Sequence, residues 1–445
     1  MKNQIIKGFL FAATVLTFSC NKKLDTVPTG SIDASSALKT NDDVQVALVG
    51  SYKDFGSADF FGGRIFMEKD LLADPGYIDW TGTYQDLTQI HNKQIPVDNY
   101  FVTADWLAGY KAINDVNNVL GALNVVSASA KNRVEGEAKF IRGASYFELV
   151  KTFAKDWNNG NPNSNPGIPL VLKPTLAITD SSFVKRNTVA EVYQQVISDL
   201  KDASDKLPES NGFYATKAAD FAMLARVYLQ QSDFAASRDA ANEAITLYQG
   251  ALENSFSNVF GAPNSSEDIF AIQVTTSSGT QGFNEFYSSA QRGDVQITND
   301  FMSIFESSDK RANLFYVNNN SRYSTKFDEL YGNVHIVRLA EMYLIRAETN
   351  FRLGTSVGAT PVDDINKIRA RAGLTGYTAA DLTIDKILKE RLLELAFEGS
   401  WLDDLKRTKG TIFSSSIAWN SPKLVFPIPK REIVVNSNLT QNEGY

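Results

Sequence analysis

The sequence predicts a mainly helical protein with long loops and a few short strands, and two observations carry this prediction. Apolar or small residues recur at helical spacing in several segments. The clearest stripe consists of Val134, Ala138, Ile141, Ser145 and Leu149. Three long stretches with little helical periodicity lie between such segments, at residues 54–104, 154–187 and 250–334. Because loops of this length in a compact protein usually carry function, we expect a helical scaffold that presents binding loops.

The N-terminal residues resemble an export signal. Lys2 and Lys7 flank the start of an apolar run at residues 8–18, which suits a signal-peptide core and is too short to cross a bilayer. The run ends in Ser19 and Cys20, where a small residue before cysteine resembles a lipobox. We expect cleavage before Cys20 and lipidation of its thiol, and the alternative is a free thiol that happens to end an apolar run.

Local signals place the ends of individual helices. Thr188 with Glu191 forms a capping box, and the apolar stripe that follows predicts a helix that ends at Pro208. Thr360 before Pro361 predicts the start of another helix, because proline is favoured at the first helical position.

Two segments resemble the helix pairs of tetratricopeptide repeats, which need small residues where paired helices touch. In the first segment, the matching residues are Leu224, Ala225, Tyr228, Ser237, Ala241 and Ala244. In the second segment, they are Tyr343, Ala347 and Gly354. The segments are scattered along the chain, so we do not expect a regular solenoid.

Composition excludes several classes of function. The net charge of −7 becomes −9 once Lys2 and Lys7 are removed with the signal, and an acidic body repels phosphate backbones, so we expect no nucleic-acid partner. One cysteine and two histidines exclude an internal disulfide and a multi-histidine zinc centre. The sequence has no P-loop, dinucleotide-binding or EF-hand motif. We therefore expect no metal and no cofactor.

Several motifs together resemble the SusD/RagB family of outer-membrane nutrient-binding lipoproteins. The mature start CNKKLD at 20–25 is similar to the usual opening of that family, and EAKFIR at 137–142 with GIPL at 167–170 resembles its first long helix and the turn after it. The strongest match is RLAEMYLIRAE at 338–348 followed by INKIRARAGL at 365–374. The resemblance covers essentially the whole mature chain.

The resemblance implies a SusD-like scaffold of tetratricopeptide-like helix pairs decorated by ligand-binding loops. It divides the chain into a lipoprotein signal peptide (1–19), a lipidated tether (20–35), an N-terminal SusD-like region (36–260) and a C-terminal SusD/RagB region (261–445), the last two forming one compact unit. It further implies a non-enzymatic protein, anchored in the outer membrane and facing the cell surface, that captures a glycan or oligosaccharide for a SusC-like TonB-dependent transporter.

Three alternatives remain open at this stage. A tetratricopeptide-type scaffold would bind a peptide of another protein, and a member of the same family would take up peptides as nutrients. A surface glycosidase would need two carboxyl groups about 5 to 10 Å apart. Its candidate acids are the neighbouring pairs Asp42–Asp43, Glu267–Asp268, Asp363–Asp364 and Asp403–Asp404. Asp42 and Asp363 have a simpler interpretation as helix-start residues, and Asp404 has one as a partner of nearby cations.

Sugar capture needs aromatic faces that stack on pyranose rings, with amides or carboxylates that bind the hydroxyl groups. One loop has this mixture, and the resemblance places ligand contacts there; its candidates are Tyr77, Asp79, Trp80, Tyr84 and Gln85. Trp80 is the best single candidate, although it could equally seal an edge of the core. A second Gly/Ser-rich region supplies Phe283, Asn284, Tyr287 and Arg292.

Other conspicuous side chains are expected to be structural. His335 is expected at the start of an apolar helix and His91 in a polar loop, and neither has the neighbours of a catalytic base. Trp106 and Tyr110 recur at helical spacing and are expected in the core. Trp157 lies among asparagines and, like Trp80, could either contact a ligand or seal an edge of the core.

Overall fold

The computed structural model describes residues 38–261, 264–276, 279, 281–410 and 417–445. The residues from Leu38 to Tyr445 form one compact unit. The structure is mainly helical with three small two-stranded sheets in its described part, as the sequence predicted. The predicted signal peptide, the tether and Cys20 lie outside the described residues.

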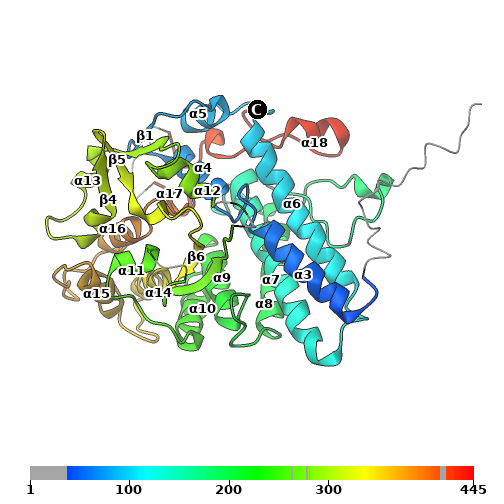
Figure 1. Cartoon of the computed structure of the whole chain (residues 1–445), viewed down its shortest axis with the longest axis horizontal. Coiled ribbons are helices and arrows are strands. Elements are labelled where there is room, and N and C mark those ends of the chain that lie inside the picture. The colour runs from blue at the N-terminus through cyan, green and yellow to red at the C-terminus, as the bar shows by residue number, and fades with distance from the viewer. Residues whose placement is uncertain (1–37, 262–263, 277–278, 280, 411–416) are drawn as a thin grey trace, which may run out of the picture. The chain divides into compact units, whose positions relative to one another are not determined.

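A row of antiparallel helices forms the scaffold, and each helix packs on the next (Figure 1). Its members are α3 (Asn41–Phe55), α6 (Tyr100–Gly121), α7 (Ala128–Phe153), α8 (Val189–Ser204), α9 (Lys217–Gln230), α10 (Phe234–Leu247), α14 (Leu339–Leu353), α15 (Pro361–Arg371) and α16 (Ile384–Glu394). The predicted capping signals hold: the Thr188 side chain accepts from the Glu191 backbone amide, and the Thr360 side chain caps α15.

The tetratricopeptide-like contacts are present between α9 and α10. Helices α9 and α10 pack on each other, and Ala225 of α9 and the small residues Ser237, Ala241 and Ala244 of α10 are buried. The Ser237 hydroxyl donates to the Ala225 carbonyl at 2.8 Å. Small side chains allow this close approach of two helix backbones. Long insertions separate the helix pairs, so the scaffold is not a regular repeat.

The predicted stripe on α7 is buried, but it is not the only buried face of that helix. Every residue from Phe140 to Phe153 is buried, including Lys151. Glu137 is buried as well, because α3, α6, α8 and α9 pack around α7. Ion pairs with Arg133, Glu148 and Asp403 compensate the buried charges.

Two of the three predicted loop stretches contain regular elements. Residues 54–104 form α4 (Arg64–Ala73), β1 (Ile78–Trp80) and α5 (Gln85–His91) and enter α6. Residues 250–334 form α11 (Phe256–Phe260), β2 (Asp268–Ile272), α12 (Gly282–Tyr287), β3 (Val295–Ile297), α13 (Asn299–Ser303), β4 (Phe315–Asn318), β5 (Ser321–Ser324) and the start of β6 (Val334–Arg338). Residues 154–187 are irregular apart from a short 3₁₀ turn at Asp180–Ser182.

His335 lies on strand β6 and not at a helix start, because α14 begins four residues later. Its Nδ1 atom is 2.6 Å from the Asp268 carboxylate on β2. The C-terminal part is completed by α17 (Trp401–Arg407) and α18 (Lys430–Val435).

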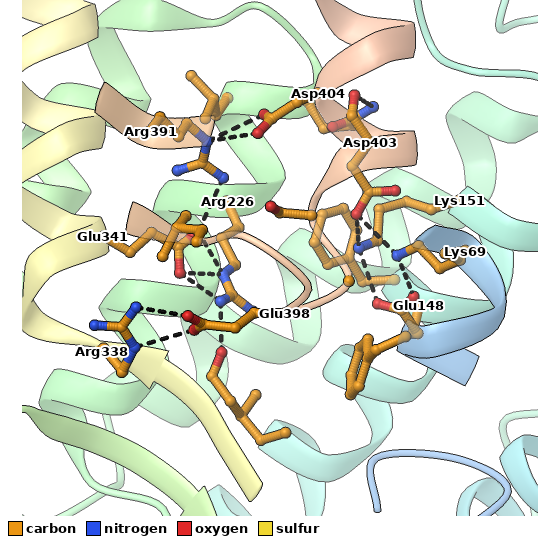
Figure 2. A pocket seen from close by; sticks show the side chains of 18 of the residues that line it. Lys69, Glu148, Lys151, Arg226, Arg338, Glu341, Arg391, Glu398, Asp403 and Asp404 are labelled. Carbon is orange, nitrogen blue, oxygen red and sulfur yellow. Dashed lines mark hydrogen bonds and ion pairs between the residues drawn. The ribbon is translucent and has the colours of Figure 1, made fainter. Parts of the chain in front are cut away.

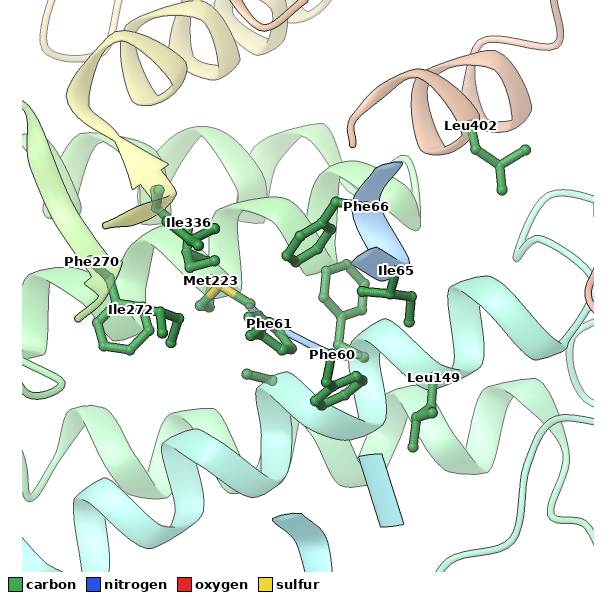
Figure 3. Packing of buried hydrophobic residues seen from close by; sticks show 14 of the residues in the cluster. Phe60, Phe61, Ile65, Phe66, Leu149, Met223, Phe270, Ile272, Ile336 and Leu402 are labelled. Atoms are coloured by element: carbon green, nitrogen blue, oxygen red, sulfur yellow. The ribbon is translucent and has the colours of Figure 1, made fainter. Parts of the chain in front are cut away.

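Aromatic side chains fill the middle of the core (Figure 3). Phe60 and Phe61 lie between Ile65 and Phe66 of α4 and the scaffold helices α7 and α9. Phe61 stacks on Phe55 of α3 with ring centroids 4.1 Å apart. This packing fixes α4 against the scaffold, and α4 in turn contacts α12, which contacts β3.

Candidate functional site

Pairing of β1 with β3 brings together the two regions in which the sequence predicted ligand contacts. The strands are antiparallel, with Asp79 opposite Gln296 and Trp80 opposite Val295. Arg292 lies three residues before β3, and Tyr84 lies four residues after β1. Strands β1, β4 and β5 gather at one end of the molecule with α13 (Figure 1). We call the surface formed by Trp80, Tyr84, Arg292, Gln296 and Tyr323 the aromatic face.

Trp80 is half-buried and held in a fixed orientation. Its indole Nε1–H donates to the Thr88 hydroxyl at 2.9 Å, and its ring contacts Phe286 of α12 with centroids 6.3 Å apart. Gly82 lies against the ring so closely that a Cβ at this position would come within 2.2 Å of Cζ2 of Trp80. The ring therefore covers Phe286 at an edge of the core and also keeps part of its own surface exposed.

Tyr84 and Arg292 stack on each other beside Trp80. The guanidinium carbon of Arg292 lies 4.3 Å from the centroid of the Tyr84 ring, and 40% of the Tyr84 surface is exposed. Arg292 Nε donates to Asp294 at 2.6 Å, and Nη2 donates to the Thr83 hydroxyl at 3.1 Å. The stack is thus an exposed, ordered platform with a cation at its edge.

The hairpin of β4 and β5 adds two tyrosines that the sequence analysis missed. Tyr316 and Tyr323 are directly opposite each other, with ring centroids 6.0 Å apart. Gln296 bridges the sheets, since its Nε2 donates to the Tyr323 hydroxyl at 3.4 Å and to Thr81 at 3.3 Å. The signal for the hairpin was Asn319–Asn320, whose positive φ values of 49° and 66° suit a two-residue turn.

Three candidates from the second predicted region lie inside the protein. Phe283, Asn284 and Tyr287 are on α12 and are 3% or less exposed. Asn284 donates to the backbone carbonyls of Phe327 and Asp328 at 2.7 and 3.1 Å, which fixes the chain before β6. The expectation that these residues belong to a long loop was wrong, because they form a short helix that packs under the aromatic face.

The remaining candidates surround the aromatic face. Asp79 and Gln85 are exposed, on β1 and at the first residue of α5. Tyr77 is half-buried and packs edge-on against Phe301 and Trp401, with centroids 5.5 and 5.8 Å away. Tyr77 therefore belongs to the support of the face.

A second polar region lies at the centre of the scaffold, where charged side chains line a cavity of about 60 Å³ (Figure 2). Arg338 contacts Glu394 at 3.0 Å and Glu398 at 2.8 Å. Glu341 pairs with both Arg226 and Arg391. The cavity has room for water molecules only, because small-ligand sites are several times larger.

Lysines complete this buried charge cluster on its other side (Figure 2). Asp403 accepts from Lys151 at 2.6 Å and from Lys69 at 2.9 Å, and Lys69 also contacts Glu148 at 2.6 Å. Burial by itself would raise the pKa of Asp403, but the charges of the two lysines outweigh it and lower that pKa. These charges are neutralised within the protein.

The acids considered for glycoside hydrolysis have structural partners. Arg391 and Arg407 bind Asp404, and Arg346 binds Asp364. The remaining partners are Arg371 and Arg338 for Glu267, His335 for Asp268, the Thr360 cap for Asp363 and the Thr40 capping box for Asp43.

Two family models match the chain. One, described as "Starch-binding associating with outer membrane", matches residues 73–229, and the other, described as "SusD family", matches residues 311–412. The SusD-like protein P2 of Formosa agariphila is 25% identical over 98% of this chain and 99% of its own length.

The chain belongs to the SusD/RagB family.

One further relative and two solved structures are similar to this chain. The starch-binding protein SusD of Bacteroides thetaiotaomicron is 33% identical over 25% of this chain and 22% of its own length. A SusD superfamily protein of the same organism superimposes with a TM-score of 0.81 at 26% identity, covering 91% of this chain and all of that one. The surface glycan-binding protein A of Bacteroides uniformis shares the fold, with a TM-score of 0.77 at 20% identity over 91% of this chain and 99% of that one.

The aromatic face of this SusD/RagB protein is assembled from both matched segments and from the part between them. Trp80 and Tyr84 lie in the first matched segment, and Tyr323 lies in the second. Arg292 and Gln296 lie in residues 230–310, which neither family model matches. In the part of the chain that the structure describes, each helix is too short or too polar to cross a membrane.

Proposed function

We propose that this SusD/RagB-family protein captures a glycan or oligosaccharide on the aromatic face and passes it to a SusC-like TonB-dependent transporter. The observation that carries the proposal is the exposed stack of Arg292 on Tyr84 beside the half-exposed ring of Trp80. Such faces contact the C–H surfaces of sugar rings, and the amide of Gln296 and the carboxylate of Asp79 can bind sugar hydroxyl groups.

The order of the face supports this role. The Trp80 ring is fixed by Thr88 and Gly82, and the Arg292 guanidinium is fixed by Asp294 and Thr83. Side chains that are already ordered lose little conformational entropy when a ligand binds. Binding without catalysis also agrees with the structural ion pairs of the acids discussed above. Names of relatives that mention starch or glycan are a further, indirect support.

The proposal includes attachment to the outer membrane through lipid on Cys20 and display on the cell surface. It rests on the lipobox-like sequence at residues 16–20 and on the description of the first family model. Radiolabelled palmitate should be incorporated by the wild type and not by Cys20→Ala, which should be released from the membrane.

Affinity electrophoresis of the soluble form, residues 21–445, in gels containing single polysaccharides tests the binding proposal. We expect one polysaccharide to retard the wild type and Trp80→Ala to lose the retardation. Trp157→Ala is a matched control, since Trp157 is also half-buried on a loop but packs on Tyr193, 5.1 Å away. Equal loss in both variants, or binding only to peptides, would contradict the proposal.

A further inference from the structure

A second hollow, of about 420 Å³, lies between the end of α3, the loop before α9 and strand β2. Its volume is within the range of about 300–1,000 Å³ that is typical of small-ligand sites. It shares no residue with the aromatic face, and the proposed function leaves it unused. The residues that matter for its chemistry are Tyr52, Asp54, Ser57, Phe213, Tyr214 and Gln273.

Two adjacent aromatic rings stand at the edge of this hollow. Phe213 is 62% exposed and Tyr214 is 37% exposed. Large aromatic side chains are usually covered, because their burial contributes strongly to folding, so two neighbouring exposed rings beside a hollow indicate a contact surface.

The loop that carries these rings is anchored on α3. Tyr52 packs against Tyr214 with ring centroids 4.8 Å apart, and the Tyr52 hydroxyl accepts from the Ala215 backbone amide at 3.0 Å. Within the loop, the side chain of Asn211 donates to the Ala215 carbonyl at 3.0 Å. The rings are therefore presented by an ordered loop, which is the same arrangement as on the aromatic face.

Polar groups suited to sugar hydroxyls line the hollow. The planar amide of Gln273 is held by Asn264 at 3.0 Å and by Asn333 at 3.1 Å. Ser57 lines the hollow as well, but its hydroxyl oxygen is buried. The Asp54 side chain, one-third exposed, contributes a carboxylate that Lys111 neutralises.

An adjoining hollow leads from this position towards the aromatic face. It has a volume of about 500 Å³ and shares Asp54 and Ser57 with the hollow at Phe213 and Tyr214. It follows the outer surface of α6 to Tyr100, which is 63% exposed. Tyr100 packs edge-on against Phe101 at 5.5 Å, and Phe101 contacts Tyr84 at 5.6 Å. The two hollows thus adjoin, and the exposed Tyr100 at the far end is linked to Tyr84 of the aromatic face through the buried ring of Phe101.

We propose that the hollow at Phe213 and Tyr214 is a second carbohydrate-binding site, and that it holds another part of the same glycan chain that the aromatic face binds. This inference rests on the proposed function and deepens it, because two separated sites favour an extended polysaccharide over a short oligosaccharide. Simultaneous contact at two sites raises the affinity for a long chain well above that of either site alone.

Hydroxyl-radical footprinting of the mature chain with mass spectrometry reads both sites in one experiment. The probes are amylopectin, laminarin, xylan and galactomannan, each added separately. We expect the polysaccharide that protects Trp80 and Tyr84 from oxidation to protect Phe213 and Tyr214 as well. Protection confined to Trp80 and Tyr84 would overturn the second site alone. Protection confined to Phe213 and Tyr214 would overturn the aromatic face as the ligand site, and with it the binding of one glycan chain by two sites. Protection of neither pair by any of the four would overturn both proposals.

A variant distinguishes binding of one polysaccharide chain at two sites from binding at one site. Phe213→Ala should lower the affinity for the polysaccharide by roughly tenfold and leave the affinity of the aromatic face for its disaccharide unchanged, since the loss is one of two linked contacts. Val46→Ala is the matched control, because Val46 is 72% exposed on α3 and does not line the hollow. Equal affinity of Phe213→Ala and wild type for the polysaccharide would overturn the second site.

Discussion

The buried charge cluster and the aromatic face are both rich in polar groups, but they are built in opposite ways. In the cluster, cations and carboxylates pair within the protein around a cavity of about 60 Å³. On the face, the exposed Arg292 keeps one side of its guanidinium on Tyr84 and its edge near solvent. The most charged region of this fold therefore holds the scaffold together, while the capacity to bind a ligand lies where polar groups are ordered but still accessible.

Breaking the cluster should have the largest effect on stability. Arg338→Met leaves the carboxylates of Glu267, Glu394 and Glu398 buried with fewer cations, so we expect a loss of about 3–5 kcal/mol in the free energy of unfolding. Urea unfolding measures this loss. Lys155→Met is the control, since its pair with Glu443 is largely exposed and should contribute less than about 1 kcal/mol. A loss below about 1 kcal/mol in Arg338→Met would contradict the structural role of the cluster.

Acid should unfold the protein through the same cluster. Burial by itself would raise the pKa of Glu341, Glu348 and Glu394, but neighbouring arginines outweigh it and lower each pKa to about 2. Groups whose pKa falls on folding stabilise the protein above their ordinary pKa of 4.5, and this stabilisation is lost as the pH falls from 4.5 towards 2. Chemical unfolding followed across this pH range should therefore show a steep decline in stability; a flat profile would contradict it.

One buried carboxyl pair lacks the cations of the cluster and should respond to pH with the opposite sign. Burial raises the pKa of Glu68 to about 8, and burial together with the Glu68 charge raises the pKa of Asp105 well above its ordinary value. Such groups destabilise the folded state as the pH rises from 4.5 to about 8. Glu68→Gln should reduce this decline by roughly 1–3 kcal/mol between about pH 5 and about pH 8. Urea unfolding at several pH values measures the decline. The same decline of unfolding free energy with pH in Glu68→Gln and wild type would refute this prediction.

Changes on the aromatic face should weaken binding and leave the cluster intact. Arg292→Ala removes the guanidinium from Tyr84, so we expect roughly tenfold weaker glycan binding and a change in unfolding free energy below about 1 kcal/mol. Arg292→Lys should recover little, because an ammonium lacks the planar surface that stacks on Tyr84. Calorimetric titration measures the affinities. Wild-type affinity in Arg292→Lys would show that the positive charge alone matters for glycan binding.

The smallest expected effect concerns Tyr323. Tyr323→Phe removes the hydroxyl that accepts from Gln296 and should weaken glycan binding by about 0.5–1.5 kcal/mol. Tyr331→Phe, at a tyrosine that is 45% exposed and outside the face, is the matched control. A larger loss than in Arg292→Ala would move the centre of the site to the β4–β5 hairpin.

The scaffold could be predicted from sequence where helices show one apolar stripe and a polar cap, as at Thr188 and Thr360. Helix α4 was not predicted because every residue from Ile65 to Ala73 is buried. Its charged residues therefore do not form the exposed polar face by which an amphipathic helix is recognised in sequence. Lys69 and Asp70 look like surface residues in the sequence, and only their partners in distant segments explain their burial.

The aromatic face was only partly predictable for a related reason. The aromatic content of its loops pointed to Trp80, Tyr84 and Arg292, which the structure brings together. The pairing of Trp80 with Val295 joins segments more than two hundred residues apart, and no local pattern encodes it. Without that contact, the sequence could not separate Phe283 and Tyr287, which face the core, from Arg292, which faces solvent.

The most direct test of the account is calorimetric titration of the double variant Tyr84→Ala/Arg292→Ala with the glycan that retards the wild type, together with its thermal unfolding. We expect that binding is lost while the melting temperature stays close to that of the wild type, because the face contributes to capture and the buried cluster to stability. Wild-type affinity in this variant would contradict the assignment of the ligand site to the aromatic face.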